Sequence, residues 1–273
     1  MAVLGAFLAA LGVADAFRDT HPHGISPARR YTALVAGLVT LIALFAAGGV
    51  TPATGLSVGV PLALLLAVWV LLDVITRTVG ETAARSAAFL ALGAGIIVAL
   101  LFGDSSSAAW PAWAPGPLSA FSPSQVVFVT GIALAQVTTA NVLVRLILDA
   151  VKVPTKAGTD RLRSGRVLGP MERLFIVGLG LAGNLTAAAV VVGAKGLLRF
   201  PELAASESST RAAASPIIIQ SSMSGEPAKG AGVSPTVPAH QGPNPVTEYF
   251  LIGSFASWLL ALAGLGLARL VLG

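Results

Sequence analysis

Apolar stretches of membrane-spanning length alternate with short polar stretches along the whole chain. A helix needs about 20 residues to cross roughly 30 Å of hydrocarbon at 1.5 Å per residue. We predict seven helices from this pattern, with bounds 1–17, 31–50, 56–76, 86–102, 125–151, 174–194 and 248–272. The predicted fold class is therefore all-α, a polytopic bundle of transmembrane helices in one integral membrane domain.

Residues 201–247 interrupt the pattern. This segment is rich in Ser, Pro, Ala and Gly, and it cannot bury enough apolar surface to fold alone. We expect a flexible loop here. It separates six transmembrane helices within residues 1–200 from a seventh within residues 248–273.

The sixth apolar stretch allows two topologies. The twenty-one residues from Leu174 to Ala194 include no ionisable side chain and are long enough to cross. We therefore favour a crossing. In the alternative, Gly183 and Asn184 break the stretch into a re-entrant pair of short helices, which leaves six crossings. Such a break is tolerated at membrane depth only where protein surrounds it.

The composition agrees with a bilayer environment. The chain of 273 residues is 55% hydrophobic and 11% charged, whereas a soluble domain carries about 25% charged residues. Its mean hydropathy is +0.84. The absence of cysteine excludes disulfides, thiolate metal sites and cysteine nucleophiles. The net charge of +5 is not gathered on a basic face with aromatic residues between the cations, so no nucleic-acid partner is predicted.

The cations predict the orientation. Twelve Lys and Arg residues fall in the connections on one predicted side, and the opposite loops, 51–55 and 103–124, hold none. Cytoplasmic loops carry the excess of Lys and Arg. We therefore place the N-terminus outside the bacterial cytoplasmic membrane and the C-terminus inside. The basic loop 152–173 is then cytoplasmic and faces anionic lipid.

Two local motifs have alternative interpretations. Gly178–Gly183 matches G-x-G-x-x-G, but a dinucleotide site needs this motif between a strand and a helix, and here the flanks predict a membrane helix. His21 and His23 are metal-ligand types, but Pro22 between them indicates a solvated turn. We predict no cofactor and no metal site.

Polar residues in the fifth and sixth spans are the main candidate site residues. Gln136 lies in mid-span, Asn141, Arg145 and Asp149 follow at helical i,i+4 spacing, and Asn184 lies in the sixth stretch. One interpretation is interhelical hydrogen bonding, with Arg145 and Asp149 at the cytoplasmic end of the helix. The other is a water-accessible pathway, because such side chains cannot face lipid cheaply.

The last span supplies a packing face and a carboxylate. Small residues recur every three or four positions and predict a smooth stripe that faces another helix, most directly the sixth. They are Gly253, Ser257, Ala261, Gly264 and Ala268. Glu248 opens this span, and we predict that it pairs with Lys195 or Arg199.

Three pieces of the C-terminal half carry a resemblance. They are Gly165-x-x-x-Gly169-x-x-Glu172-Arg173, Ala194-Lys195-x-x-x-Arg199-Phe200 and Glu248-Tyr-Phe-Leu-Ile-Gly-Ser254. They resemble an uncharacterised family of bacterial multi-spanning membrane proteins, a domain of unknown function, over roughly residues 130–270. The segment 201–247 is longer than the short connection typical of that family. The resemblance implies an architecture and a candidate site, without a reaction.

Two functions follow as hypotheses. The first is transport, channel activity or membrane-embedded ligand binding, with a site among seven candidates: Gln136, Asn141, Arg145, Asn184, Lys195, Arg199 and Glu248. The second is a non-catalytic assembly or accessory subunit that docks on a second copy or on another membrane protein. No catalytic residues are predicted, because no paired-carboxylate motif, no Ser/His/Asp arrangement and no histidine occurs within a span.

Overall fold

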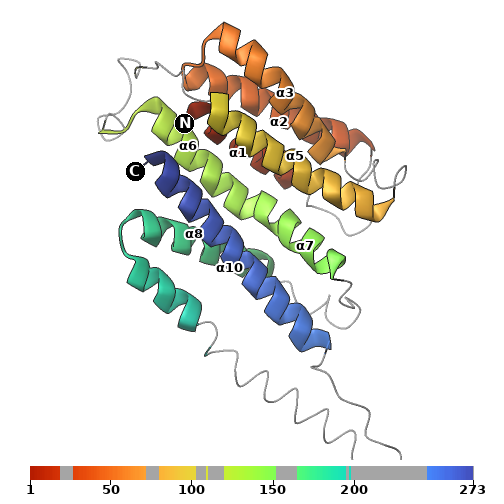
Figure 1. Ribbon diagram of the computed structural model, residues 1–273, viewed down its shortest axis with the longest axis vertical. Helices are drawn as coiled ribbons and strands as arrows, with labels where there is room; N and C mark the ends of the chain where they lie inside the picture. Colours follow the sequence, from red (N-terminus) through yellow and green to blue (C-terminus); the bar gives the residue numbers. More distant parts are fainter. Residues whose placement is uncertain are drawn as a thin grey trace, which may run out of the picture.

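The computed structural model describes residues 1–18, 27–71, 80–102, 109, 120–151, 165–194, 197 and 245–272. Those residues form helices and no strand, which confirms the all-α prediction (Figure 1). The helices are α1 (Ala2–Arg18), α2 (Pro27–Ala47), α3 (Pro52–Val70), α5 (Glu81–Phe102), α6 (Pro123–Leu134), η2 (Ala135–Thr139), α7 (Ala140–Ala150), α8 (Gly165–Leu181) and α10 (Pro245–Leu272). A short apolar helix, Leu185–Ala194, follows α8.

Five helical stretches are long and apolar enough to cross a membrane. They are Ala28–Ala47, Pro52–Val70, Glu81–Phe102, Pro123–Ala150 and Leu251–Leu272. These spans give the chain the architecture of a multi-spanning membrane protein. Two of the seven predicted spans, 1–17 and 174–194, are not among the five.

The turn predicted at residues 51–55 is shorter than expected. The side chain of Thr51 accepts a hydrogen bond from the Thr54 N–H, and Pro52 occupies the first turn of α3. A threonine cap followed by proline is a favourable helix start, so α3 begins at Pro52 rather than at residue 56.

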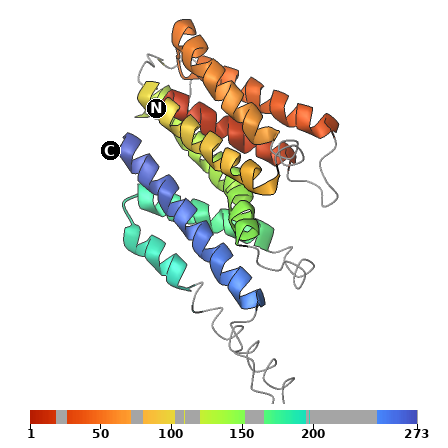
Figure 2. The same ribbon diagram turned by 45° about the vertical axis from the view of Figure 1, so that its right-hand side comes forward.

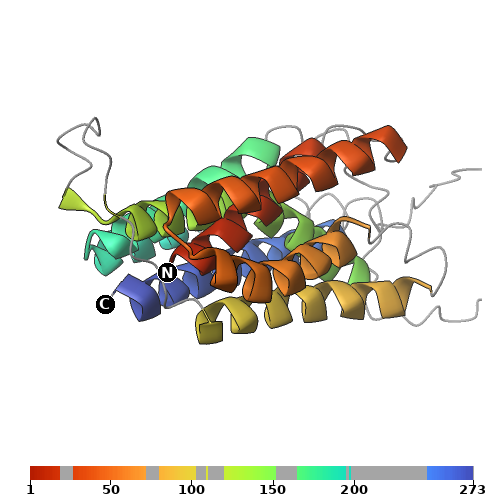
Figure 3. The same ribbon diagram turned by 90° about the horizontal axis from the view of Figure 1, so that it is seen from above.

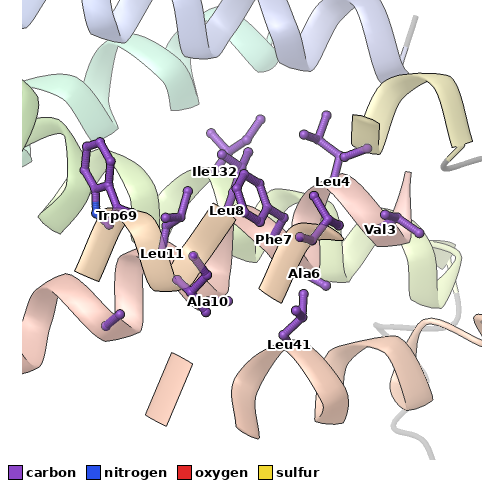
Figure 4. Close-up of a cluster of buried hydrophobic side chains, with 14 of the residues drawn as sticks. Val3, Leu4, Ala6, Phe7, Leu8, Ala10, Leu11, Leu41, Trp69 and Ile132 are labelled. Carbon is purple, nitrogen blue, oxygen red and sulfur yellow. The ribbon is translucent and has the colours of Figure 1, made fainter. Parts of the chain in front are cut away.

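Helix α1 forms the centre of the bundle. It contacts α2, α3, α5 and α6, and thirteen of its seventeen residues are buried. Figures 1 and 3 show it in the interior, and Figure 4 shows Phe7 and Leu11 among the side chains of the apolar core. A helix that is apolar on all sides is typical of such a position. Because protein surrounds it, α1 does not need the length of a lipid-facing span.

Two glycines bring α1 and α6 into contact. A Cβ atom added at Gly131 would lie 2.1 Å from the Gly5 carbonyl oxygen, and one added at Gly5 would lie 2.4 Å from the Phe128 Cα. Farther along the same pair, Gly12 lies against Leu134. Residue numbers rise together along both helices, so α1 and α6 run in parallel.

Helix α10 runs antiparallel to the α6–α7 stretch. Gly253 faces Leu148, whereas Gly264 faces Gln136. Because α6 is parallel to α1, α10 ends where α1 begins, and Figures 1 and 2 show both termini at that end. Both ends of the described chain therefore lie at the same end of the bundle, whereas the predicted seven crossings place the two termini on opposite sides.

The difference comes from the sixth apolar stretch, which is not one helix. The Asn184 N–H donates to the Leu179 carbonyl (2.8 Å), and the Gly183 N–H donates to the Gly180 carbonyl (3.1 Å). Gly183 has φ +83°, so these residues form a Schellman cap that ends α8. The chain then turns into Leu185–Ala194, the unlabelled teal helix below α8 in Figure 1.

The two helices thus form a hairpin, as Figures 1 and 2 show. The favoured continuous crossing over 174–194 is wrong, and the break falls at Gly183 and Asn184, where the alternative placed it. The physical reason is that glycine adopts the left-handed conformation without steric cost. We call α8 and Leu185–Ala194 together the helical hairpin.

Candidate functional site

The α6–α7 stretch contains a π-helical turn near its midpoint. This turn, η2, occupies Ala135–Thr139 within the span Pro123–Ala150. A π turn shifts the backbone hydrogen-bond register and leaves backbone groups for other partners. Within it, Gln136 is 6% exposed and Thr139 is 2% exposed, so both polar side chains are buried at mid-span.

Arg173 of α8 reaches this turn and is 2% exposed. Its Nε donates to the Gln136 backbone carbonyl at 2.9 Å, and its Nη1 donates to the Ser257 Oγ at 2.8 Å. Its Nη2 donates to the Asn141 Oδ1. The guanidinium therefore joins α8 to η2, α7 and α10 at the level of the π turn.

The α8 sequence explains why an arginine points inward. Arg173, Ile176, Val177 and Gly180 are all buried, and their i,i+3,i+4,i+7 spacing places them on one helical face. At the end of this face, a Cβ atom added at Gly180 would lie 2.3 Å from Leu265 of α10. Apolar packing against α10 thus carries Arg173 into the interior.

The small-residue stripe of α10 forms the opposite wall. Ser257 is 6% exposed and Ala261 and Ala268 are 0% exposed, whereas Leu259 on another face is 51% exposed. Ser257 faces α8 through Arg173, and Gly264 faces η2 through Gln136. The prediction that this stripe packs against protein is confirmed. The stripe contacts both α8 and the α6–α7 stretch.

Gln136 and Asn141 make the interhelical contacts predicted for them. The Gln136 Nε2 donates to the Leu260 carbonyl of α10 at 3.0 Å. Asn141 accepts from Arg173, and its Nδ2 donates to the Val137 carbonyl at 2.9 Å. The amide of Gln136 fits because Gly264 has no side chain: a Cβ atom there would lie 2.2 Å from the Gln136 Nε2.

The positive charge of Arg173 has neutral hydrogen-bond partners. Among the residues that the structure describes, no carboxylate forms an ion pair with it. Glu172, the next residue, attracts the guanidinium electrostatically and has contacts of its own. A guanidinium carries five N–H groups. Three of them donate to the acceptors above, so two (5 − 3) have no acceptor within the described ranges.

Two buried polar atoms of the π turn also lack a hydrogen-bond partner in the described part of the chain. They are the Gln136 Oε1 and the Thr139 Oγ1. The neighbouring Thr138 is satisfied, because its hydroxyl donates to the Gly12 carbonyl (2.7 Å) or to the Leu134 carbonyl (2.9 Å). A buried polar atom without a partner is costly, so a protein retains few of them without a functional or structural reason.

A second buried charge lies on the α1 side of the π turn. Asp15 is 0% exposed; the Trp69 Nε1 donates to both carboxylate oxygens, at 3.0 and 3.1 Å. The Arg18 Nη1 forms an ion pair with Asp15 at 3.2 Å and donates to the Trp69 carbonyl at 3.2 Å. The Thr139 side chain lies near the Asp15 carboxylate. The π turn therefore lies between a neutralised pair and Arg173.

The other predicted site residues lie elsewhere. Arg145 and Asp149 are exposed near the end of α7, and Asn184 is exposed at the cap of α8. Lys195, Arg199 and the side chain of Glu248 lie outside the described residues, so the Glu248 pairing stays a prediction. His21 and His23 lie outside them too. Within the described ranges, no group of three or more His, Asp or Glu could hold a metal.

Four members of these clusters were not predicted from the sequence. Arg173 was grouped with the basic loop 152–173, and no role was predicted for Asp15, Arg18 or Trp69. The helical spacing of Arg173 with Ile176 and Val177 is the signal that identifies it as buried.

The chain matches no protein-family model, no curated protein and no solved structure. The resemblance described above therefore stays a prediction.

Proposed function

We propose that this chain is a membrane-embedded ligand-binding or transport protein, with its site between the π turn and the helical hairpin. The observation that carries the proposal is the burial of Arg173 near the midpoints of the α6–α7 stretch and of α10, with neutral hydrogen-bond partners. Ionisable residues inside membrane proteins are costly and mark binding sites or ion pathways by default.

The π turn supports the same location. Single π-helical turns inside α-helices occur frequently at functional sites, because they release backbone groups and re-aim side chains. Here the turn offers the Gln136 carbonyl to Arg173 and leaves the Gln136 Oε1 without a partner in the described ranges. A ligand or an ordered water would satisfy that atom.

The helical hairpin carries Arg173 to the site. Arg173 lies on α8, which ends at the cap formed by Gly183 and is joined to the end of α10 by a hydrogen bond from Arg269 to the Gly180 carbonyl. A cation at the C-terminal end of a helix stabilises that end through the helix dipole.

The proposed orientation follows from the fold and the cations. Arg18, Arg29, Arg85 and Arg145 lie toward the end of the bundle opposite to the beginning of α1, on the α1, α2, α5 and α7 helices. The positive-inside rule makes that end cytoplasmic. Both termini then lie outside, in what we propose is the bacterial cytoplasmic membrane, and the hairpin returns to the cytoplasmic side.

Cysteine accessibility tests the proposal, because the chain has no native cysteine. Ser257→Cys places a thiol beside Arg173, and Ala88→Cys places one in the apolar core, where Ala88 is 0% exposed. Both proteins are treated with a small water-soluble thiol reagent in vesicles. We expect Ser257→Cys to react at least tenfold faster, because a binding site must open to water. Equal, slow reaction of both thiols contradicts the proposal.

The second candidate function is that of an accessory subunit, and the packing of α1 favours it. The contact of Gly5 with Gly131 leaves no space between α1 and α6. If the side chains around Arg173 stay packed as tightly as those around Gly5, a ligand has no room to bind. The bundle would then serve assembly and not binding. An unreactive thiol at Ser257 supports this alternative.

A further inference from the structure

We infer that the ligand of this site carries an anionic oxyacid group, a carboxylate or a phosphate, which Arg173 binds through its Nη atoms. The inference rests on the proposed function and names the chemistry that the site recognises. It is carried by the charge, the free donors and the unpartnered acceptor that the described residues gather at one level of the bundle.

The charge argues for an anion. Asp15 forms its ion pair with Arg18 on the α1 side of the π turn, so this buried carboxylate is not the counter-charge of Arg173 on the α8 side. Moving a charge from water into an apolar interior is costly even after the protein relaxes. An opposite charge that accompanies it lowers this cost. Glu172 offsets part of this cost from the adjacent position, without an ion pair to Arg173 among the described residues.

The hydrogen bonds specify an oxyacid. Within the described ranges, the two N–H groups without a protein acceptor belong one each to Nη1 and Nη2, because each of these nitrogens already donates once. Guanidinium presents such donors as a rigid fork, and carboxylate and phosphate oxygens match that spacing. A halide has only one acceptor atom, so it matches the two donors less well than a pair of oxygens does.

The Gln136 side chain adds a second requirement. Its Nε2 donates to the Leu260 carbonyl, one helical turn along α10 from the Ser257 that holds Arg173. Its Oε1 is buried and has no partner in the described part of the chain. This acceptor is suited to a hydroxyl or ammonium group of the ligand. The preferred ligand therefore carries a hydrogen-bond donor beside its anionic group.

The same chemistry has two sources in a membrane. A lipid headgroup such as phosphatidylglycerol combines a phosphate with hydroxyl groups, and a soluble hydroxy acid or phosphate ester does so as well. Both sources use the same contacts, so the experiment compares them directly.

The test measures the thermal stability of the purified protein in phosphatidylcholine vesicles. Inorganic phosphate, acetate and glycerol 3-phosphate are added separately at constant ionic strength, with chloride as the reference anion. A second arm adds phosphatidylglycerol to the vesicles instead. A ligand present at ten times its Kd favours the folded state about tenfold. We expect stabilisation by the oxyacids over chloride, and a larger effect of glycerol 3-phosphate than of inorganic phosphate.

Four variants assign the effect. Arg173→Lys keeps the charge but loses the fork, so we expect at least tenfold weaker binding of the oxyacids. Gln136→Met should abolish the preference for glycerol 3-phosphate over phosphate. Arg85→Gln removes a cation from an exposed pair and should change neither response. Arg173→Gln should abolish the response; if it does not fold, Arg173→Lys decides the point.

The outcomes separate the inference from the proposed function. No stabilisation of the wild type by phosphate, acetate, glycerol 3-phosphate or phosphatidylglycerol beyond chloride overturns the inference. A response that Arg173→Lys leaves unchanged overturns it too. If Ser257→Cys is still accessible to water in that case, the proposed function stands with a different ligand; if it is inaccessible, both fail.

Discussion

The contact between α1 and α6 allows the sharpest stability prediction, because it is made by backbone atoms. Gly131→Ala adds one methyl group at a position where its carbon would lie 2.1 Å from the Gly5 carbonyl oxygen and 2.8 Å from the Gly5 Cα. Real Cβ contacts are almost never closer than 3.0 Å, so the two helices must separate locally by at least 0.9 Å (3.0 − 2.1). No side chain can rotate to relieve the contact.

The magnitude follows from that separation. A gap of 0.5–1 Å forfeits about a quarter to a half of the dispersion energy of the atoms that line it. Extra methylenes in a packed core cost about 1–3 kcal/mol. Because the clash here is with backbone, we expect a loss of about 2–3 kcal/mol, at the upper end of that range. The matched control is Gly266→Ala in α10, where an added Cβ atom meets nothing within 4 Å. There we expect a change between zero and a gain of about 1 kcal/mol, because alanine favours the helix.

The assay is reversible unfolding in mixed detergent micelles, followed by circular dichroism. The free energies of unfolding of Gly131→Ala and Gly266→Ala are compared with that of the wild type. A difference of about 2 kcal/mol between the two variants corresponds to a factor of about 30 in the unfolding equilibrium. Equal stabilities of the two alanine variants would refute the close approach of α1 and α6.

Three further predictions concern the polar clusters and the topology. Gly264→Ala should displace the Gln136 amide from the Leu260 carbonyl and cost about 1 kcal/mol in the same unfolding assay; no loss would contradict the contact. Asp15→Asn should lower the free energy of unfolding by about 3–5 kcal/mol, because it leaves the buried Arg18 without its counter-charge. The control, Glu81→Gln in the exposed pair with Arg85, should cost about 0–1 kcal/mol. Similar losses in the two variants would count against burial of the Asp15–Arg18 pair. Cysteines at Thr51 and Leu270 should react with an impermeant reagent from the same side of the membrane, and reaction from opposite sides would restore an odd number of crossings.

The sequence predicted the parts of the fold that depend on length and hydropathy. The α2, α5, α6–α7 and α10 helices lie where the apolar stretches placed them, within a few residues. The smooth face of α10 was also predictable, because Gly253, Ser257 and Ala261 recur at helical spacing regardless of which helix covers them. These features follow from local composition alone.

Features that depend on register and tertiary contacts were less accessible. The break at Gly183 was one of two alternatives, because a glycine within an apolar stretch is compatible with both a helix and a cap. Composition gives no signal for the π turn at Ala135–Thr139, which contacts α1, α8 and α10. The role of Arg173 was hidden by its position at the end of a basic segment.

The central claim is that the buried Arg173 belongs to a ligand site and not to a packed core. Native mass spectrometry of the protein released from the membrane tests it most directly, because it reports what co-isolates with the chain. We predict that the wild type retains an anionic species, a lipid or a small oxyacid, and that Arg173→Lys retains much less of it under the same conditions. Identical spectra for the two proteins, with the same bound species or with none, would contradict the account.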